Sequence, residues 1–302
     1  MPSSLLFAIA SLIWGSTFWA ITLQLGHVPP AVSVVYRFAL ASLTLFAICL
    51  VRRDKLSLPW RAQRWMILQG FLTFCLSYLC TYTAEQYVVS ALVAVMFALM
   101  VFFTPICARI GFGKPIPPRT WSAGTAAIAG VLLMFYHALA GAFSDHFLVG
   151  VLLATAASFA SSAGSVVVGK VREEASNLPL TMAWSMLWGT LMVTAYTLLS
   201  GQAFSLPSTP SYLAGLVYLA IFGSVIAFYA YFTLINRIGP QKAVYVTVVT
   251  PVISVLLSIK LENYRPGALE WAGMTLCLAS VAWALRAPPA PVINQDNLLE
   301  IP

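Results

Sequence analysis

Four polar side chains share one face of an otherwise apolar segment in the first third of the chain. Tyr78, Thr81, Tyr82 and Glu85 stand at positions i, i+3, i+4 and i+7, which places them on one face of an α-helix. Hydroxyl groups inside a bilayer need partners, so this face should look toward protein or water. Tyrosine rings flanked by hydroxyl groups are suited to bind an aromatic ligand that carries polar groups. We favour a cavity wall over helix–helix hydrogen bonding or an interfacial aromatic belt.

Side chains of the same kinds occur in other apolar segments. Trp14 lies in the middle of its segment, which favours a place in the same wall, whereas Trp184 lies near a segment end, where interfacial tryptophans are common. The expected substrate-binding set, beyond Tyr78, Thr81 and Tyr82, is Trp14, Arg37, Trp188, Ser224, Tyr229 and Tyr245.

Arg37 is the one cation that lies well inside an apolar segment and not at a segment end. Three interpretations compete: the side chain snorkels to the outer surface, it pairs with Glu85 near the same membrane face, or it attracts the carboxylate of a substrate. Two prolines, Pro105 and Pro251, also lie inside apolar segments, where each removes a helical hydrogen bond and predicts a kink.

Carboxylates are sparse within the apolar segments. An ion-coupled carrier usually keeps a titratable carboxylate at membrane depth, yet only Glu85 borders the membrane, and the segment around Trp14 has no acid. The three histidines fall in or beside outer loops. This pattern favours facilitated transport without proton coupling.

Composition indicates what holds these residues in place. Of the 302 residues, 60% are hydrophobic and 8% charged, far below the roughly 25% charged residues of soluble domains. Too few charged side chains are present to cover a soluble fold. The net charge of +7 is not concentrated in a basic run beside a globular domain, so nucleic acid is not an expected partner.

About 20 apolar residues are needed to cross a bilayer as a helix. The chain contains ten such segments, which predicts an all-α membrane protein with ten transmembrane helices. They are residues 3–25, 31–51, 65–85, 88–110, 119–137, 147–169, 179–200, 210–236, 242–260 and 267–286. The first segment lacks a preceding basic residue and is expected to remain as a span. The Pro-rich residues 287–302 are expected to form a disordered cytoplasmic tail.

The basic residues predict the orientation, because Lys and Arg of short loops stay on the cytoplasmic side. With the N-terminus inside, 13 of the 16 Lys and Arg residues fall in inward connections or the tail, two fall outside, and Arg37 lies within a span. Both termini are therefore predicted to be cytoplasmic. The five cysteines lie in spans and are expected to be packing residues, not disulfides.

Weak internal similarity predicts a duplication. A shift of 151 residues lays Tyr78 on Tyr229, and Trp121 with Gly124 matches Trp271 with Gly273. Two repeats are expected, at residues 1–137 and 138–286. Because each has five helices, the second should be inverted relative to the first around a central cavity, the geometry of alternating access.

The sequence resembles a known family over about residues 4–286. The resemblance rests on the five-plus-five spans, on WGSTF at Trp14 to Phe18, and on Pro251 followed by Glu262 and Gly267. The family is the drug/metabolite transporter superfamily, and the chain resembles its EamA-type members. The tyrosine-rich third span is similar to that of the bacterial aromatic amino acid exporters in this group. One departure is Lys114 after Gly113, where the family often has glutamate.

The expected function is export of aromatic and other neutral amino acids across the bacterial inner membrane, by a monomeric carrier without cofactor or metal. Export of other small metabolites or drugs is the alternative. A membrane enzyme is less favoured, because no H-E-x-x-H or G-x-S-x-G motif is present.

Overall fold

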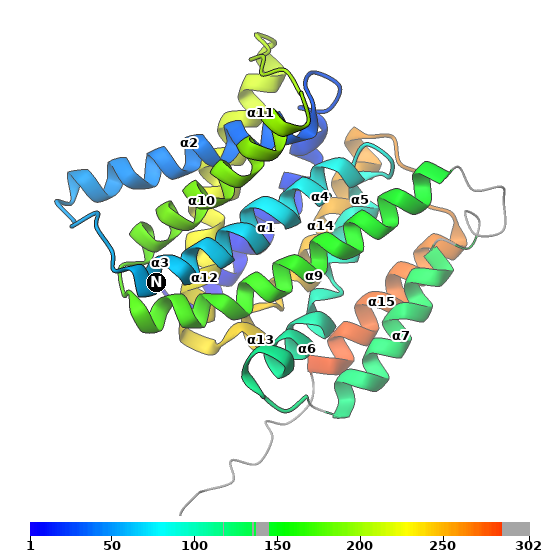
Figure 1. The fold of residues 1–302 in the computed structure, drawn as a ribbon. Coiled ribbons are helices and arrows are strands. Elements are labelled where there is room, and N and C mark those ends of the chain that lie inside the picture. The colour runs from blue at the N-terminus through cyan, green and yellow to red at the C-terminus, as the bar shows by residue number, and fades with distance from the viewer. Residues whose placement is uncertain (117, 135, 137–144, 286–302) are drawn as a thin grey trace, which may run out of the picture.

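Helices occupy all ten segments that were expected to span the membrane (Figure 1). The structure, a computed structural model, describes residues 1–116, 118–134, 136 and 145–285, and this part of the chain contains no β-strand. His137 and the tail expected at 287–302 lie outside it. The first half comprises α1 (Ser3–Thr22), α2 (Pro30–Val51), α3 (Trp60–Gln69), η1 (Gly70–Ser77), α4 (Tyr78–Ala84), α5 (Ser90–Phe97), α6 (Met100–Phe112) and α7 (Pro118–Met134). The second comprises α9 (Asp145–Glu174), α10 (Leu178–Leu199), α11 (Pro210–Ala220), η2 (Ile221–Ile226), α12 (Ala227–Ile238), α13 (Pro240–Ala243), α14 (Val246–Leu261) and α15 (Ala268–Leu285).

Length and hydropathy qualify most of these helices as membrane spans. Seven are long and apolar enough, and α5 with α6 makes an eighth if the pair is one span bent by 42°. The apolar part of α7, Trp121–Met134, is shorter than the others, and α15 packs along it. The described chain is thus a multi-pass helical membrane protein, and the crossing of all ten segments stays a prediction.

Corresponding spans of the two halves are interrupted in the same way. The third and eighth spans each contain a π-helical segment, η1 and η2, a distortion often found at functional sites. The fourth and ninth spans each break before a proline-containing helix, at Ala98–Leu99 ahead of Pro105 and at Val244–Tyr245 ahead of Pro251. Pro105 and Pro251 therefore follow the breaks at matching distances along the chain.

Glycines permit the closest helix contacts. Gly70 in η1 faces α10, where an added Cβ would lie 2.5 Å from the carbonyl oxygen of Ser185. Gly189 of α10 faces η1 in turn, and its Cβ would lie 2.6 Å from the Cβ of Phe74. Any larger residue would push these helices apart, because backbone cannot yield as a flexible side chain can. This contact fixes η1, and with it α4, against α10.

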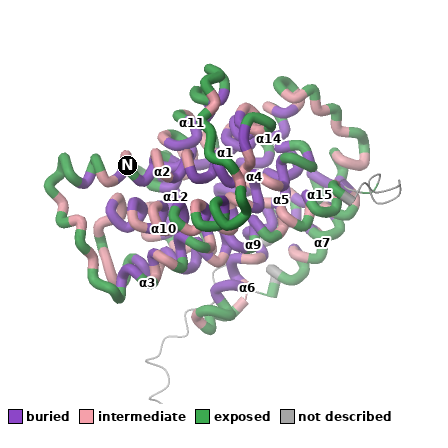
Figure 2. Tube along the Cα trace, turned by 45° about the horizontal axis from the view of Figure 1, so that its top comes forward, coloured by how far each residue is buried: buried purple, intermediate pink, exposed green. Residues whose placement is uncertain are grey.

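Two large clusters of buried apolar side chains form most of the core, and Figure 2 marks the buried positions along the chain. One joins mainly α1, α2, η1, α4, α10 and α12, and the other joins mainly α5, α6, α7, α9, α14 and α15. Each cluster therefore contains helices from both halves of the sequence. The halves interlock, and side chains from both clusters meet in the middle of the bundle, where a small cavity lies.

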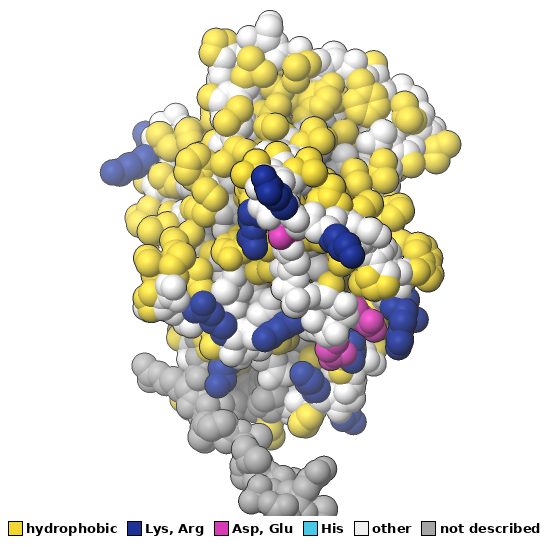
Figure 3. Space-filling view, turned by 90° about the vertical axis from the view of Figure 1, so that its left-hand side faces the viewer, with side chains coloured by type: hydrophobic (Ala, Val, Ile, Leu, Met, Phe, Trp, Pro, Cys, Tyr) yellow, Lys and Arg dark blue, Asp and Glu magenta, His cyan; other side chains and the backbone are white. Residues whose placement is uncertain are grey.

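Basic side chains gather over one end of the bundle. Figure 3 views the left-hand side of Figure 1, where the connection between α2 and α3 lies, and shows many Lys and Arg side chains there. Exposed members of this basic end include Arg53, Arg61, Arg172 and Arg237. All five cysteines are free and buried.

Candidate functional site

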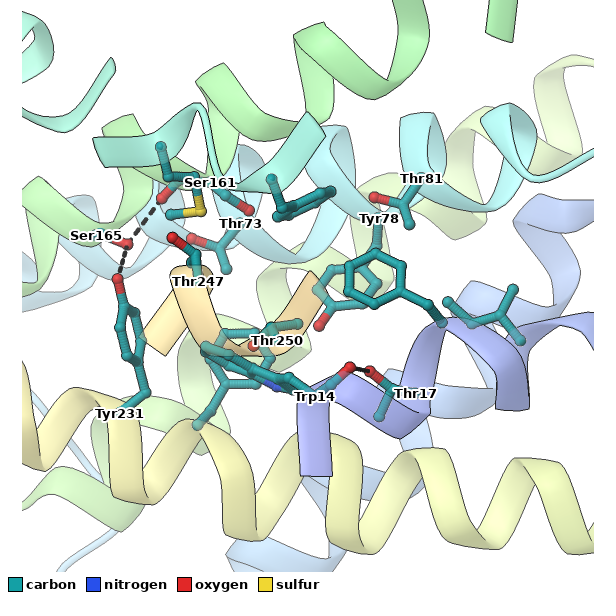
Figure 4. A pocket seen from close by; sticks show the side chains of 15 residues that line it. Trp14, Thr17, Thr73, Tyr78, Thr81, Ser161, Ser165, Tyr231, Thr247 and Thr250 are labelled. Carbon is teal, nitrogen blue, oxygen red and sulfur yellow. Dashed lines mark hydrogen bonds between the residues drawn. The ribbon is translucent and has the colours of Figure 1, made fainter. Parts of the chain in front are cut away.

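A small cavity lies at the centre of the bundle, where six spans meet (Figure 4). Its free volume is about 50 Å³, enough for a few water molecules but well below the roughly 300–1,000 Å³ of ligand pockets. A solute larger than water can enter only if the surrounding helices separate. Its lining comes from α1 (Trp14, Thr17, Phe18, Ile21), η1 and α4 (Thr73, Tyr78, Thr81), α5 and α6 (Phe97, Met100), α9 (Ser161, Ser165), α12 (Phe228, Tyr231) and α14 (Thr247, Thr250).

Aromatic rings form one side of this central cavity. Trp14 makes edge contacts with Phe228 and Tyr231, with ring centroids 5.0 Å and 4.9 Å apart. The Trp14 indole Nε1 donates a hydrogen bond to the carbonyl oxygen of Gly223 in η2 (3.2 Å), which fixes the ring. Tyr78 extends the wall, and its ring centroid lies 6.1 Å from that of Phe228. The wall can therefore offer edge and face contacts to another aromatic ring.

Hydroxyl groups line the rest of the central cavity, and most of them have already used their hydrogen. Thr81 Oγ1 donates to the carbonyl oxygen of Ser77 (2.8 Å), and Thr250 Oγ1 donates to that of Val246 (3.0 Å). The same type of bond is made by Thr17, Ser165 and Thr247. A hydroxyl that donates to its own helix keeps its oxygen lone pairs available. These oxygens are acceptors, which suit a donor such as an ammonium group.

Arg37 of α2 lies directly behind Tyr78. Its side chain is fully buried, and the guanidinium carbon lies 4.6 Å from the centroid of the Tyr78 ring. Arg37 Nε donates to Ser224 Oγ (2.9 Å), Nη1 to Tyr82 Oη (3.3 Å), and Nη2 makes a long contact with Tyr78 Oη (3.5 Å). A guanidinium has five N–H donors, so part of its capacity is free.

The environment of Arg37 bears on two of the three sequence interpretations, snorkelling and a pair with Glu85. A side chain that is 0% exposed does not snorkel. Among the described residues the ion pairs are Arg52–Asp54 and Lys170–Glu173, so Arg37 makes no direct pair with Glu85. Glu85 acts on Arg37 only from a distance. Among the described residues, the buried cation therefore has hydroxyl groups as hydrogen-bond partners and no carboxylate in contact.

Glu85 is buried at the end of α4 instead of lining the central cavity. It is 7% exposed, and neither carboxylate oxygen has a hydrogen-bond partner. Its charged neighbours are Glu262 and Arg37. Glu262 accepts a hydrogen bond from Ser90 Oγ (2.7 Å). The helical face predicted from the sequence is thus divided, with Tyr78 and Thr81 toward the cavity and Glu85 away from it.

The sequence-predicted site residues fall into three groups. Trp14, Tyr78 and Thr81 line the central cavity. Arg37, Tyr82 and Ser224 form a hydrogen-bonded cluster behind Tyr78. The remaining three do not line the cavity: Trp188 Nε1 donates to Gln63 Oε1 (2.8 Å), Tyr229 is 42% exposed, and Tyr245 packs against the second core cluster.

Several cavity residues were not predicted from the sequence. They are Thr17, Phe18, Ile21, Thr73, Phe97, Met100, Ser161, Ser165, Phe228, Tyr231, Thr247 and Thr250. Hydroxyls recurring every third or fourth residue, as in Ser161 and Ser165, are a possible signal. Ser158 and Ser162 have the same spacing on the same helix and do not line the cavity. Spacing alone therefore could not identify the correct face.

Three comparisons with known proteins bear on the chain. A model of the EamA-like transporter family matches residues 1–136 and 148–286. The Escherichia coli K12 protein described as "Uncharacterized inner membrane transporter YedA" is 30% identical over 305 residues, which cover 97% of this chain and 95% of that protein. The "Probable amino-acid metabolite efflux pump" of the same strain is 24% identical over 282 residues, which cover 89% and 90%.

A solved structure described as "Crystal structure of protein" has a similar fold. The TM-score is 0.66 at 19% sequence identity, over 93% of this chain and 96% of that chain. This likeness extends over the whole bundle and concerns the fold alone.

Proposed function

The chain belongs to the EamA-like transporter family, and on that premise we propose that it is a carrier that exports amino acids, aromatic and other neutral ones. Its relatives are described as inner membrane transporters, and its helices are those of a multi-pass membrane protein. One relative at 24% identity is described as a probable amino-acid metabolite efflux pump, which supports this substrate class.

One observation carries the proposal: the central cavity, together with Arg37 behind its Tyr78 wall, contains a separate partner for each part of a zwitterionic amino acid. The rings of Trp14, Phe228 and Tyr231 suit an apolar or aromatic side chain. The hydroxyl oxygens suit the ammonium group. Arg37, buried behind Tyr78 without a carboxylate in contact, suits the substrate carboxylate. The Tyr78 ring must move for that contact to form.

Transport then requires alternating access between two inverted five-helix halves, with both termini in the cytoplasm. The matching π-helical segments and proline-containing helices of the two halves support this duplication. Helix breaks near Pro105 and Pro251 border the cavity residues Met100 and Thr247, so bending there would change the cavity volume. The basic end supports the orientation, since Lys and Arg favour the cytoplasmic side.

The carrier is further proposed to be facilitated, not proton-coupled. No Asp or Glu is found among the described residues that line the central cavity. Direction would follow from the higher amino acid concentration in the cytoplasm. The carrier is also proposed to act as a monomer. The alternative cargo, other small metabolites or drugs, would use the same rings without needing Arg37.

Uptake of labelled amino acids by liposomes that contain the purified protein tests the proposal. We expect saturable counterflow of L-phenylalanine, at rates that change by less than about twofold when a proton gradient is imposed or collapsed. Protein-free liposomes are the control. Absence of saturable amino acid counterflow would refute the function, and a rate that depended strongly on the gradient would refute the uncoupled mechanism.

Thr81→Val should lower L-phenylalanine counterflow by about fivefold, because it removes one acceptor for the ammonium group, a contribution of about 1 kcal/mol. Thr83→Val is a matched control on the same helix. Both hydroxyls donate to the carbonyl four residues earlier, but only Thr81 lines the central cavity. Equal rates in the two variants would contradict the role of Thr81.

A further inference from the structure

A second cavity, here called the inner vestibule, lies between the central cavity and the basic end of the bundle. Its free volume is about 200 Å³. Its lining includes Gln69 on α3, Arg172 on α9, Thr181 on α10, Phe232 and Asn236 on α12, and Ser176 in the α9–α10 connection. It is larger than the central cavity and is lined by polar and apolar groups together.

Three spans place the inner vestibule next to the central cavity, always in the same order. On α9, Ser165 lines the central cavity and Val168, one turn later, lines the vestibule. On α12, Tyr231 lines the central cavity and Phe232, the next residue, lines the vestibule. In the third span, Gln69 lines the vestibule one turn before Thr73 of the central cavity. The vestibule therefore lies one helical turn farther toward the basic end.

A contact between α9 and α12 lies on the central-cavity side of the vestibule. The hydroxyls of Ser165 and Tyr231 lie 3.3 Å apart, and both side chains face the central cavity (Figure 4). The neighbouring Phe232 is 2% exposed and forms part of the vestibule wall. Movement of α12 relative to α9 would break the Ser165–Tyr231 contact.

The vestibule wall holds a buried amide with a free end. Gln69 is 2% exposed, and its Oε1 accepts a hydrogen bond from Ser185 Oγ (2.9 Å). Its Nε2 is sealed from solvent and has no partner. Ser185 thus fixes one end of the amide, and the other end is a donor without a partner on a residue that lines the vestibule. A buried donor without a partner is rare in native proteins.

An unused acceptor and a cation accompany this donor. Asn236 Oδ1 is also buried without a partner. Arg172 Nη1 donates to the backbone carbonyl of Asn236, which holds the exposed guanidinium beside it. Thr181 Oγ1 donates to the Leu178 carbonyl (3.0 Å), so its oxygen remains an acceptor. One wall thus combines a cation and a donor with two acceptors.

We propose that the inner vestibule is a second binding site for the transported zwitterionic amino acid, occupied on the basic side before the central cavity. Gln69 Nε2 and Arg172 would bind the carboxylate of the amino acid. Asn236 Oδ1 and Thr181 Oγ1 would bind its ammonium group, and Phe232 would contact its side chain. The proposal rests on the proposed function for the identity of the ligand. It adds a site that precedes the Ser165–Tyr231 contact.

Protection of an engineered thiol tests this site in the purified full-length protein. Ser176 is exposed and lines the vestibule, whereas the five native cysteines are buried. Saturating L-phenylalanine should slow maleimide labelling of Ser176→Cys by at least about threefold, because the ligand competes for the same space. Ser57→Cys, exposed in the α2–α3 connection, is the matched control and should label at one rate with or without ligand.

Variants and analogues identify the groups that bind. Gln69→Leu and Asn236→Leu should each abolish protection of Ser176→Cys. Gln69→Glu keeps an acceptor for the Ser185 hydroxyl and should also abolish protection of Ser176→Cys, because its carboxylate repels that of the ligand. This variant replaces Gln69→Leu in the experiment if the leucine variant does not fold. Phenethylamine and 3-phenylpropionate, which each lack one charged group, should protect weakly.

A central-cavity variant separates local binding from a distant effect. Protection of Ser176→Cys should persist with Tyr78→Ala; its loss there would show that protection reports the central cavity and would overturn the proposal. Counterflow by the unmodified protein without any protection of Ser176→Cys would also overturn it, while leaving the transport function intact. Protection without counterflow would support the vestibule and refute the transport function.

Discussion

Replacing Arg37 by leucine is expected to lower L-phenylalanine counterflow by at least about thirtyfold, equivalent to roughly 2 kcal/mol for a lost charge-assisted contact in a buried site. The guanidinium is fully buried behind Tyr78, and its hydrogen-bond partners are hydroxyls, not carboxylates. A substrate carboxylate would be its first anionic partner in contact. Counterflow of labelled substrate into liposomes measures the effect.

Two comparisons make the Arg37 result specific. Arg37→Lys keeps the charge without the planar fork and should retain more activity than Arg37→Leu. Arg61→Leu removes an exposed cation at the basic end and should leave counterflow unchanged. Phenethylamine, which has no carboxylate, should be transported equally by the unmodified protein and Arg37→Leu. Wild-type phenylalanine counterflow in Arg37→Leu would remove Arg37 from the substrate site.

Tyr82→Ala is expected to destabilise the protein by about 3–5 kcal/mol, the usual cost of truncating a buried aromatic side chain. Tyr82 is 0% exposed, and its hydroxyl donates to Gln24 Oε1 (2.9 Å) while accepting from Arg37. Truncation would leave both a cavity and unpaired polar groups. Thermal unfolding in detergent, followed by circular dichroism, measures the loss.

Tyr78→Ala should behave differently, although the two tyrosines are one helical turn apart. Tyr78 is only half-buried and faces the central cavity, so its loss should impair counterflow more than stability. Tyr82→Phe, which keeps the ring, should recover most of the stability lost in Tyr82→Ala. Equal melting temperatures for Tyr78→Ala and Tyr82→Ala would contradict this division of roles.

The third span illustrates how far the sequence predicted the site. Spacing correctly placed Tyr78 and Thr81 on a polar, inward face, because helix geometry fixes which residues share a side. It did not separate them from Tyr82 and Glu85, which lie on the same face. That division depends on α1 and α2: Gln24 follows α1 and Arg37 lies on α2, and the two draw the Tyr82 hydroxyl away from the cavity.

The misplaced candidates have the same physical explanation. Trp188, Tyr229 and Tyr245 have suitable chemistry but do not line the central cavity: Trp188 and Tyr229 lie on other helix faces, and Tyr245 lies in the break before α14. Tyr229 was matched to Tyr78 by the internal repeat, yet Phe228 and Tyr231 are the residues of α12 that reach the cavity. The aligned position therefore did not predict the direction of the side chain.

The sequence by itself determined that the protein lies in a lipid bilayer, where along the chain its helices lie, and at which end of the bundle its cations gather. These properties follow from composition and local order, since each helix satisfies its own backbone and each apolar segment seeks lipid. The tertiary structure alone decided which hydroxyls meet, that Arg37 lies behind Tyr78 without a carboxylate in contact, and that Gln69 and Asn236 face one vestibule. Such juxtapositions depend on the rotation and packing of neighbouring helices, which sum over contacts between residues far apart in the chain.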